Sequence, residues 1–388
     1  MKSDVGQFAC IEDVHKAALR TMDSNTRNYY ESGAVDQITL GLNASDFGKI
    51  LLRPRVLTDV SVIDLSTTIL DECVSSPLAI APSAMHGLVH NDAEKGTGKA
   101  AARTNTLMTL SSYSNTALED VVAQVEGTPH MPPYWIQLYV HKDRSIAEGL
   151  VRKAIRAGYK AVVLTVDAPV LGRRLEDIRN KFAMPPHLKL LNFSEDQQVT
   201  TQSAQVSTPD AADVQKAKQK GAVADASLSW KDLDWLRSVT GKAMKIVLKG
   251  IMTPEDAVLA CEWNVDAFII SNHGGRQLDT TPSTISVLPA IKAAVDTFAR
   301  SHPGRHVPEI YLDGGVRRGT DVIKAIALGA RAVFIGRPVL WGLAVGGADG
   351  VQHVLRLFHE EMRNGMALLG VTKVEDIGPS CVQLKSAL

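Results

Sequence analysis

The stretch Ala267-Phe268-Ile269-Ile270-Ser271-Asn272-His273-Gly274-Gly275-Arg276-Gln277-Leu278-Asp279 places reactive polar residues directly after a short apolar run. The run 267–270 is typical of a buried strand. His273 can take up a proton near neutral pH, and Arg276 presents a planar fork of donors that matches a carboxylate. The pair indicates a site that holds an acid and removes a proton beside it. Alone, such a pair is more typical of an ordinary polar loop, so the rest of the chain decides.

Short apolar runs recur on both sides of this stretch and alternate with amphipathic, helix-like segments. The alternation predicts parallel strands joined by helices. Eight such units favour an α/β fold of the (β/α)8 TIM barrel type over an open doubly wound sheet. The predicted strands are Leu78–Ala81, Leu107–Leu110, Trp135–Leu138, Ala161–Val166, Lys245–Leu248, Ala267–Ile270, Ile310–Leu312 and Ala332–Ile335.

We interpret residues 1–388 as a single domain with the barrel at 76–345. Residues 1–75 form an N-terminal segment with a helix predicted over about Ile11–Tyr30, and residues 346–388 form a C-terminal helical segment. After the fourth strand comes a long polar tract, Asn192–Ala226. Loops of this length usually act as lids or lack fixed structure. We expect a mobile lid at the barrel mouth; a solvated linker without a role is the alternative.

The composition excludes several classes of function. The chain is 22% charged, with 42 basic and 42 acidic residues, so no general field attracts nucleic acid or an anionic membrane. The four cysteines show no CxxC spacing, which argues against a zinc site or a disulfide scaffold, and we expect no metal. No apolar run approaches the roughly 20 residues that a membrane helix needs.

Cysteine usage and a polar N-terminus without a visible secretory signal favour an intracellular location. The chain ends Ser386-Ala387-Leu388, which shares only its first and last positions with a peroxisomal Ser-Lys-Leu address. Since Ala387 places a methyl group where that signal has a cation, we interpret the ending as chance. The prediction is cytoplasmic, with the peroxisome as the alternative.

Polar and basic residues gather just beyond the predicted strands, where a barrel of this type has its active site. The loops after the seventh and eighth strands add glycines and two arginines, a pattern typical of a phosphate site, although tight turns alone would also use those glycines. The residues concerned are Pro82, Ser83, Ala84, Ser111, Tyr113, Gln137, Tyr139, Thr165, Asp167, Arg174, Lys249, Ser271, His273, Arg276, Asp313, Gly315, Arg317, Gly336 and Arg337.

With these motifs the chain resembles the FMN-dependent 2-hydroxy acid oxidases and dehydrogenases, a family that includes glycolate oxidase, lactate oxidase, mandelate dehydrogenase and the flavin domain of flavocytochrome b2. The resemblance runs from the Tyr29-Tyr30-x-x-Gly33-Ala34 segment to Met366. Its most specific pieces are Leu164–Arg174, Ser271–Asp279, Leu312–Gly319 and Phe334–Pro338.

The resemblance implies FMN as cofactor and oxidation of (S)-2-hydroxy acids to 2-oxo acids, with O2 as acceptor and H2O2 as product. It implies that His273 is the base, that Asp167 stabilises its protonated form, and that Tyr139 binds the substrate oxygen. Arg276, Arg174 and Tyr29 would hold the carboxylate. Lys249 would stabilise the reduced flavin; Pro82, Ser83, Ala84, Ser111, Gln137, Thr165 and Ser271 would line it; Asp313, Gly315, Arg317, Gly336 and Arg337 would receive its ribityl chain and phosphate. Relatives in this family are often tetramers, which implies a homo-oligomer.

Two departures bear on the size of the substrate. Tyr113 stands where many relatives have Trp, beside the substrate's side chain, and Ser83 stands where Thr is frequent. Three alternatives remain open. In the first, the electron acceptor is a quinone or another protein instead of O2. In the second, the barrel performs another FMN chemistry such as isopentenyl diphosphate isomerisation. In the third, the chain is a binding protein without catalysis. The Arg174 and Arg276 pair disfavours the second, and intact His273 and Asp167 disfavour the third.

Overall fold

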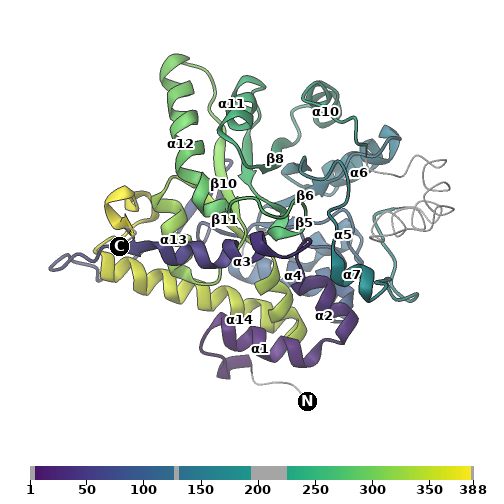
Figure 1. The fold of residues 1–388 in the computed structure, drawn as a ribbon, viewed down its shortest axis with the longest axis horizontal. Coiled ribbons are helices and arrows are strands. Elements are labelled where there is room, and N and C mark those ends of the chain that lie inside the picture. The colour runs from purple at the N-terminus through teal and green to yellow at the C-terminus, as the bar shows by residue number, and fades with distance from the viewer. Residues whose placement is uncertain (1–4, 126–130, 194–224, 386–388) are drawn as a thin grey trace.

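The computed structural model describes residues 5–125, 131–193 and 225–385. The predicted barrel is confirmed, because eight parallel strands close in the order β10-β11-β4-β5-β6-β7-β8-β9 (Figure 1). Most of the expected lid and the C-terminal tripeptide 386–388 lie outside the described residues. The barrel strands are β4 (Leu78–Ile80), β5 (Met108–Leu110), β6 (Tyr134–Leu138), β7 (Ala161–Thr165), β8 (Lys245–Ile251), β9 (Ala267–Ile270), β10 (Glu309–Asp313) and β11 (Ala332–Ile335).

Both faces of these strands are buried, which is why the sequence shows continuous apolar runs and no alternation. One face points into the barrel, where the rings of Trp135, Tyr311 and Phe334 pack with centroids 5.6–5.8 Å apart. The other face packs against the surrounding helices. These helices are α4 (Ala93–Thr104), α5 (Leu118–Val122), α6 (Arg144–Arg156), α7 (Leu175–Arg179), α10 (Asp232–Thr240), α11 (Pro254–Glu262), α12 (Thr284–Ser301), α13 (Gly319–Ala327) and α14 (Arg337–Leu369).

A hairpin covers the amino-terminal end of the barrel. It consists of β2 (Thr67–Ile69) and β3 (Glu72–Val74), which pair antiparallel. Its apolar residues join the barrel's inner core, and the Leu70 N–H donates to the Glu309 carboxylate at 3.4 Å, at the start of β10. Access to the barrel is therefore expected from the carboxyl ends of its strands.

The single helix predicted over Ile11–Tyr30 is wrong, since the structure has two: α1 (Ile11–Thr21) and α2 (Ser24–Glu31). The backbone turns extended at Met22, with ψ 138°. The Asp23 carboxylate then accepts from the N–H groups of Asn25 and Thr26, which caps the second helix. An Asp that satisfies the free N–H groups of a new helix stabilises that start over continuation of the first helix. Further on lies α3 (Ile38–Ser45).

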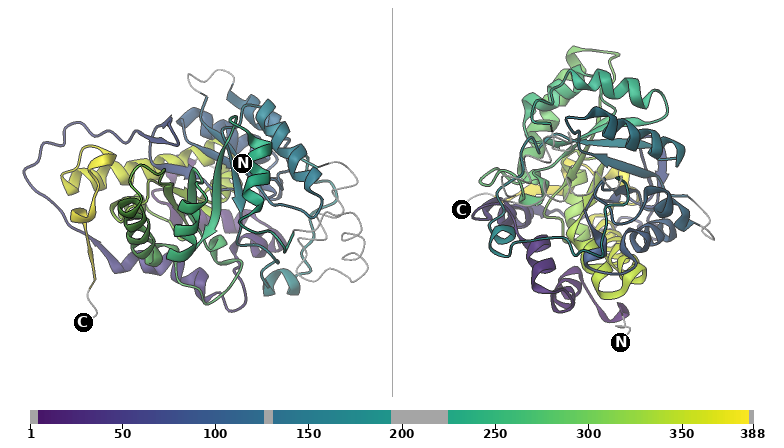
Figure 2. Two further views of the ribbon diagram at one scale, coloured as in Figure 1. Left: turned by 90° about the horizontal axis from the view of Figure 1, so that it is seen from above. Right: turned by 90° about the vertical axis from the view of Figure 1, so that its right-hand side faces the viewer.

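The long helix α14 starts directly after the eighth strand, so it crosses the boundary that the sequence suggested at 345/346. Its backbone leaves helical geometry near that point, at Gly346 and Gly347. α1 and α2 lie on the same side of the molecule as α14 (Figures 1 and 2). Near the chain ends, β1 (Ile50–Leu52) pairs antiparallel with β12 (Val382–Leu384). Among the helices described, none is long and apolar enough to span a bilayer.

Candidate active site

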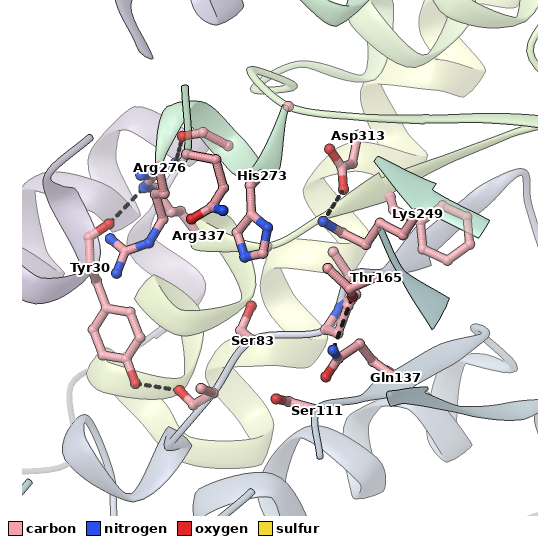
Figure 3. Close-up of a pocket in the computed structure, with 18 of the residues that line it drawn as sticks. Tyr30, Ser83, Ser111, Gln137, Thr165, Lys249, His273, Arg276, Asp313 and Arg337 are labelled. Atoms are coloured by element: carbon pink, nitrogen blue, oxygen red, sulfur yellow. Dashed lines mark hydrogen bonds and ion pairs between the residues drawn. The ribbon is translucent and has the colours of Figure 1, made fainter. Parts of the chain in front are cut away.

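A cavity lies among the carboxyl ends of the barrel strands and brings together almost every residue that the sequence singled out (Figure 3). Two of those residues, Asp167 and Ser271, stand just behind its wall and bond to residues that line it. The predicted residues in the wall are Tyr29, Pro82, Ser83, Ala84, Ser111, Tyr113, Gln137, Tyr139, Thr165, Arg174, Lys249, His273, Arg276, Asp313, Gly315, Arg317, Gly336 and Arg337.

The His273 imidazole is held in place by the loop after β9 and by a carboxylate from the loop after β7. Its backbone adopts φ 60°, and its N–H donates to the Ser271 hydroxyl at 3.1 Å. Its Nδ1 lies 2.9 Å from Asp167 Oδ1, while its Nε2 lies 3.4 Å from the Tyr139 hydroxyl. One ring nitrogen is thus committed to Asp167, and the other meets Tyr139, which also lines the cavity.

Electrostatics set this pair up as a neutral base beside an ionised partner. Burial lowers the pKa of His273, and the charge of Asp167 opposes this only in part. Burial acts to raise the pKa of Asp167, but the charges of His273 and Lys249 outweigh it, so the pKa is lowered. At neutral pH the carboxylate is ionised and the imidazole is free to accept a proton.

Gly250 on β8 makes room for Asp167. The glycine has φ 122°, and a Cβ there would lie 2.7 Å from the Asp167 Cβ and 2.9 Å from its backbone N. The strand is irregular at this point, with a register shift between Lys249 and Ile251. A larger residue would push the carboxylate away from His273.

Two further arginines, Arg174 and Arg276, line the same cavity as His273. Nη1 of Arg276 donates to the carbonyl oxygens of Tyr29 and Ser32, and its guanidinium lies over the Tyr29 ring, 4.8 Å from the centroid. Arg174 approaches it, with Nε donating to the Arg276 carbonyl oxygen at 3.4 Å. Burial and the charge of Arg276 lower the pKa of Arg174 to about 10. An anion bound between the two guanidiniums would stabilise their charged forms.

Arg337 is anchored more firmly than the sequence indicated. Its Nε, Nη1 and Nη2 donate to the carbonyl oxygens of Tyr30, Gly274 and Ser32 at 2.7, 3.0 and 3.1 Å. Burial, followed by the charges of Arg276 and Arg317, lowers its pKa to about 9. Arg337 therefore ties the N-terminal segment and the His273 loop to the start of α14, in addition to lining the cavity.

On the far side of His273 lie Lys249 and Asp313, from β8 and β10 (Figure 3). The Lys249 ammonium donates to the Ser271 hydroxyl at 3.0 Å and lies 3.6 Å from Asp313 Oδ2. The other oxygen, Asp313 Oδ1, is buried and has no hydrogen-bond partner among the described residues. Gln137 and Thr165 form a bonded pair nearby, at 3.0 Å.

The donor set fits FMN. Lys249, Arg174, Arg276, Arg317 and Arg337 bring five cationic side chains to one cavity, which a phosphate and a carboxylate would balance. The unpaired Asp313 Oδ1 suits a ribityl hydroxyl donor. Gly315 has an independent reason to be glycine, because a Cβ there would meet the Asn43 carbonyl oxygen of α3 at 1.8 Å.

Sequence reasoning missed several residues at the mouth. Tyr30 lines the cavity, and its hydroxyl lies 2.8 and 2.7 Å from the carbonyl oxygens of Ala84 and Met85, which positions the loop after β4. Only its place beside Tyr29 in the sequence hinted at this. The Phe193 ring packs on Tyr113 at 5.6 Å, so the start of the tract expected to form a lid is anchored beside the cavity. In the described part of the chain no acidic, His or Cys cluster is arranged to hold a metal ion.

Comparisons with known proteins cover the barrel and both flanking segments. Residues 18–384 match the family model described as FMN-dependent dehydrogenase. An L-lactate oxidase from Nostoc sp. is 47% identical over 92% of this chain and 93% of its own length. A 2-hydroxyacid oxidase from Dictyostelium discoideum is 45% identical over 97% of this chain and 90% of its own. A mandelate oxidase structure with (S)-4-hydroxymandelic acid matches 97% of this chain and 98% of that chain, with TM-score 0.84 and 33% identity.

Proposed function

The chain belongs to the FMN-dependent dehydrogenase family, and we propose that it oxidises (S)-2-hydroxy acids to 2-oxo acids with O2 as the electron acceptor. One observation carries the proposal: the neutral His273, backed by Asp167, shares a cavity with the paired guanidiniums of Arg174 and Arg276. A proton acceptor and a carboxylate fork side by side are what a 2-hydroxy acid requires. Relatives at this level of identity are named as oxidases, which supports O2 as acceptor.

FMN, when bound, supplies the acceptor for the two electrons that leave the substrate's α-carbon. We assign the flavin ring to the part of the cavity wall that carries Lys249, away from Arg174 and Arg276. There Lys249 would place a cation at the edge of the ring that gains negative charge. Ser271 holds that ammonium at 3.0 Å. The wall residues are Pro82, Ser83, Ala84, Ser111, Gln137 and Thr165, and the ribityl phosphate falls to Asp313, Gly315, Arg317, Gly336 and Arg337.

The substrate's carboxylate is assigned to Arg276 and Arg174. Two planar guanidiniums can bind it with paired donors, which fixes orientation as well as position. The bonds of Arg276 to the Tyr29 and Ser32 carbonyl groups restrict its rotation before the substrate arrives. Tyr113 then lies where the substrate's side chain would extend, stacked on Tyr139 with centroids 5.2 Å apart.

Proton transfer is assigned to His273. Its Nε2 takes the proton from the substrate's hydroxyl or α-carbon, and Asp167 stabilises the imidazolium that results. Burial, followed by the charge of Asp167, raises the pKa of the Tyr139 hydroxyl, so this group stays protonated and can donate to the substrate oxygen. Because the Tyr139 hydroxyl and His273 Nε2 lie 3.4 Å apart, the donor and the base can act on neighbouring atoms of one substrate.

The test is anaerobic mixing of the yellow purified protein with glycolate, (S)-lactate, (S)-mandelate and longer (S)-2-hydroxy acids, followed by admission of air. We expect the flavin to bleach with at least one acid, and air to restore the colour with release of peroxide and a 2-oxo acid. Bleaching without recovery in air would move the acceptor to a quinone or a protein. A flavin that no 2-hydroxy acid bleaches would overturn the proposal.

Two further properties remain predictions that rest on the family resemblance and on the sequence. A homo-tetramer is expected, and light scattering of the purified protein measures it. A cytoplasmic location is expected, and fluorescence microscopy of the chain tagged at its N-terminus distinguishes it from a peroxisomal one.

A further inference from the structure

Behind the phosphate end of the cavity, four side chains from separate elements form a connected array. The Arg317 guanidinium, from the loop after β10, lies over the Trp341 ring of α14, 4.8 Å from its centroid. The indole Nε1 of Trp341 donates to Glu31 Oε1 at 2.7 Å, at the end of α2. The other Glu31 oxygen lies 2.8 Å from Nε2 of His15, on α1, and the His15 ring stacks on Trp341 at 4.0 Å.

The contact with Trp341 differs from an ion pair because it leaves N–H donors of the Arg317 guanidinium free. Among the described residues, the Arg317 guanidinium forms no ion pair with a carboxylate: only the backbone N–H of Arg317 donates to Asp321 Oδ2, at 3.0 Å, while Nη1 donates to the carbonyl of its neighbour Val316 at 2.9 Å. A carboxylate would occupy several N–H donors, whereas a ring face attracts the charge of a guanidinium and leaves its in-plane donors free. Arg317 also lines the cavity, so those donors are available to an anion there.

Trp341 is itself fixed by a hydrogen bond from its indole N–H to Glu31. Its side chain is buried, at 2% exposure, and its N–H bond to Glu31 defines the plane of the ring. Burial acts to raise the pKa of Glu31, but the bonds from His15 and Trp341 and the charges of His15 and Arg337 outweigh it and lower the pKa. The acceptor of the indole bond is therefore an ionised carboxylate, and such bonds are the stronger kind.

We propose that Trp341 is a positioning residue for FMN binding: its ring orients the Arg317 guanidinium toward the FMN phosphate. Glu31 and His15 in turn fix the orientation of the Trp341 ring. The consequence is that α1 and α2, which precede the barrel, take part in cofactor retention. This inference rests on the FMN-binding function proposed above.

The test compares FMN with riboflavin, which has the same ring and ribityl chain but no phosphate. Dissociation constants are measured by flavin fluorescence on the full-length chain after removal of its flavin. Trp341→Leu should raise the Kd for FMN roughly 3- to 30-fold, the range of a cation–π contact, and leave the Kd for riboflavin unchanged. Trp341→Phe keeps a ring and loses the bond to Glu31, so it should show a smaller rise; it also guards against misfolding of the Leu variant. His15→Ala should change FMN affinity in the same direction.

A double-mutant cycle isolates the route through Arg317. In an Arg317→Leu background, Trp341→Leu should cause no further loss of FMN affinity, because the guanidinium it supports is gone. Phe358→Leu is the matched control, since it removes another fully buried ring from α14 that does not line the cavity. It should leave the ratio of the two dissociation constants at the wild-type value.

The outcomes separate this inference from the proposed function. A wild-type protein that binds riboflavin as tightly as FMN would overturn the phosphate site, and the inference with it. If wild type prefers FMN but the Trp341 variants keep the same preference, or lose affinity for both flavins equally, the positioning role alone is overturned. Loss that persists without Arg317 would also contradict it.

Discussion

At the scale of single residues, the reaction proposed above requires a neutral His273 beside an ionised Asp167. Burial lowers the pKa of His273 from its ordinary 6.5, so the base is present at pH 7 and is lost only as pH falls through the lowered value. The acid limb of kcat/KM should therefore lie below pH 6.5. Asp167→Asn removes a charge that raises this pKa, so the limb should move to still lower pH.

The same substitution should slow turnover at pH 7, because the imidazolium formed in the reaction loses its counter-charge. The measurement is a pH profile of kcat/KM for wild type and Asp167→Asn, with FMN content checked by absorbance. A limb that moves to higher pH in the variant would contradict the assignment of Asp167 as the group that favours protonated His273.

Arg276→Lys tests orientation separately from charge. Lys keeps a positive charge but offers a compact ammonium on a flexible stem, whereas Arg276 presents a planar fork fixed by the Tyr29 and Ser32 carbonyl groups. A misplacement of about 1 Å can cost roughly 10²-fold in rate. We expect a loss of that order in the limiting rate of flavin reduction at saturating substrate, measured by anaerobic stopped flow. A variant that matches the wild-type limiting rate, with only weaker binding, would show that Arg276 binds without orienting.

At the scale of elements, the fit between α3 and the loop after β10 depends on Gly315. This residue has φ 79°, and a Cβ would stand 1.8 Å from the Asn43 carbonyl oxygen. Backbone strain at such positions costs about 1–3 kcal/mol, and the overlap adds to it. Gly315→Ala should therefore lower the free energy of unfolding by at least about 1 kcal/mol in urea titrations. Gly48→Ala is the control, as no described atom outside its own stretch of backbone lies within 4 Å of its Cβ position; equal stability of the two variants would contradict this account.

The sequence predicted the barrel strands well because parallel strands buried on both faces appear as short apolar runs. It failed at Met22, where apolar spacing continues through a break and the deciding signal is the Asp23 cap. It also missed the three carbonyl bonds of Arg337, since their acceptors, Tyr30, Ser32 and Gly274, are far away in the chain. The local sequence pattern predicts where the strands lie. Long-range packing, which that pattern does not show, determines how the side chains at the strand ends are anchored.

At the scale of the whole molecule, barrel closure explains why the candidate site was predictable at all. Once eight strands are parallel and closed, the residues that follow them must face one mouth, and the cavity there is lined by the predicted residues other than Asp167 and Ser271, which stand behind its wall. Contacts between the flanking segments and the barrel were not predictable, because no periodicity marks them. The Trp341 array is such a contact, linking α1 and α2 to the cofactor end of the cavity.

The central claim is that His273 accepts the substrate's proton as the flavin is reduced, and anaerobic stopped-flow reduction of wild type and His273→Gln tests it most directly. Both proteins should carry FMN with closely similar absorbance, since the hydrogen bonds of the His273 residue within the described chain go to Asp167, Tyr139 and Ser271 and not to the phosphate loops assigned above. With the 2-hydroxy acid that bleaches wild type fastest, the limiting rate in His273→Gln should fall by at least about 10²-fold, the lower end for loss of a general base. A His273→Gln protein that reduces its flavin at a near wild-type limiting rate would contradict the account.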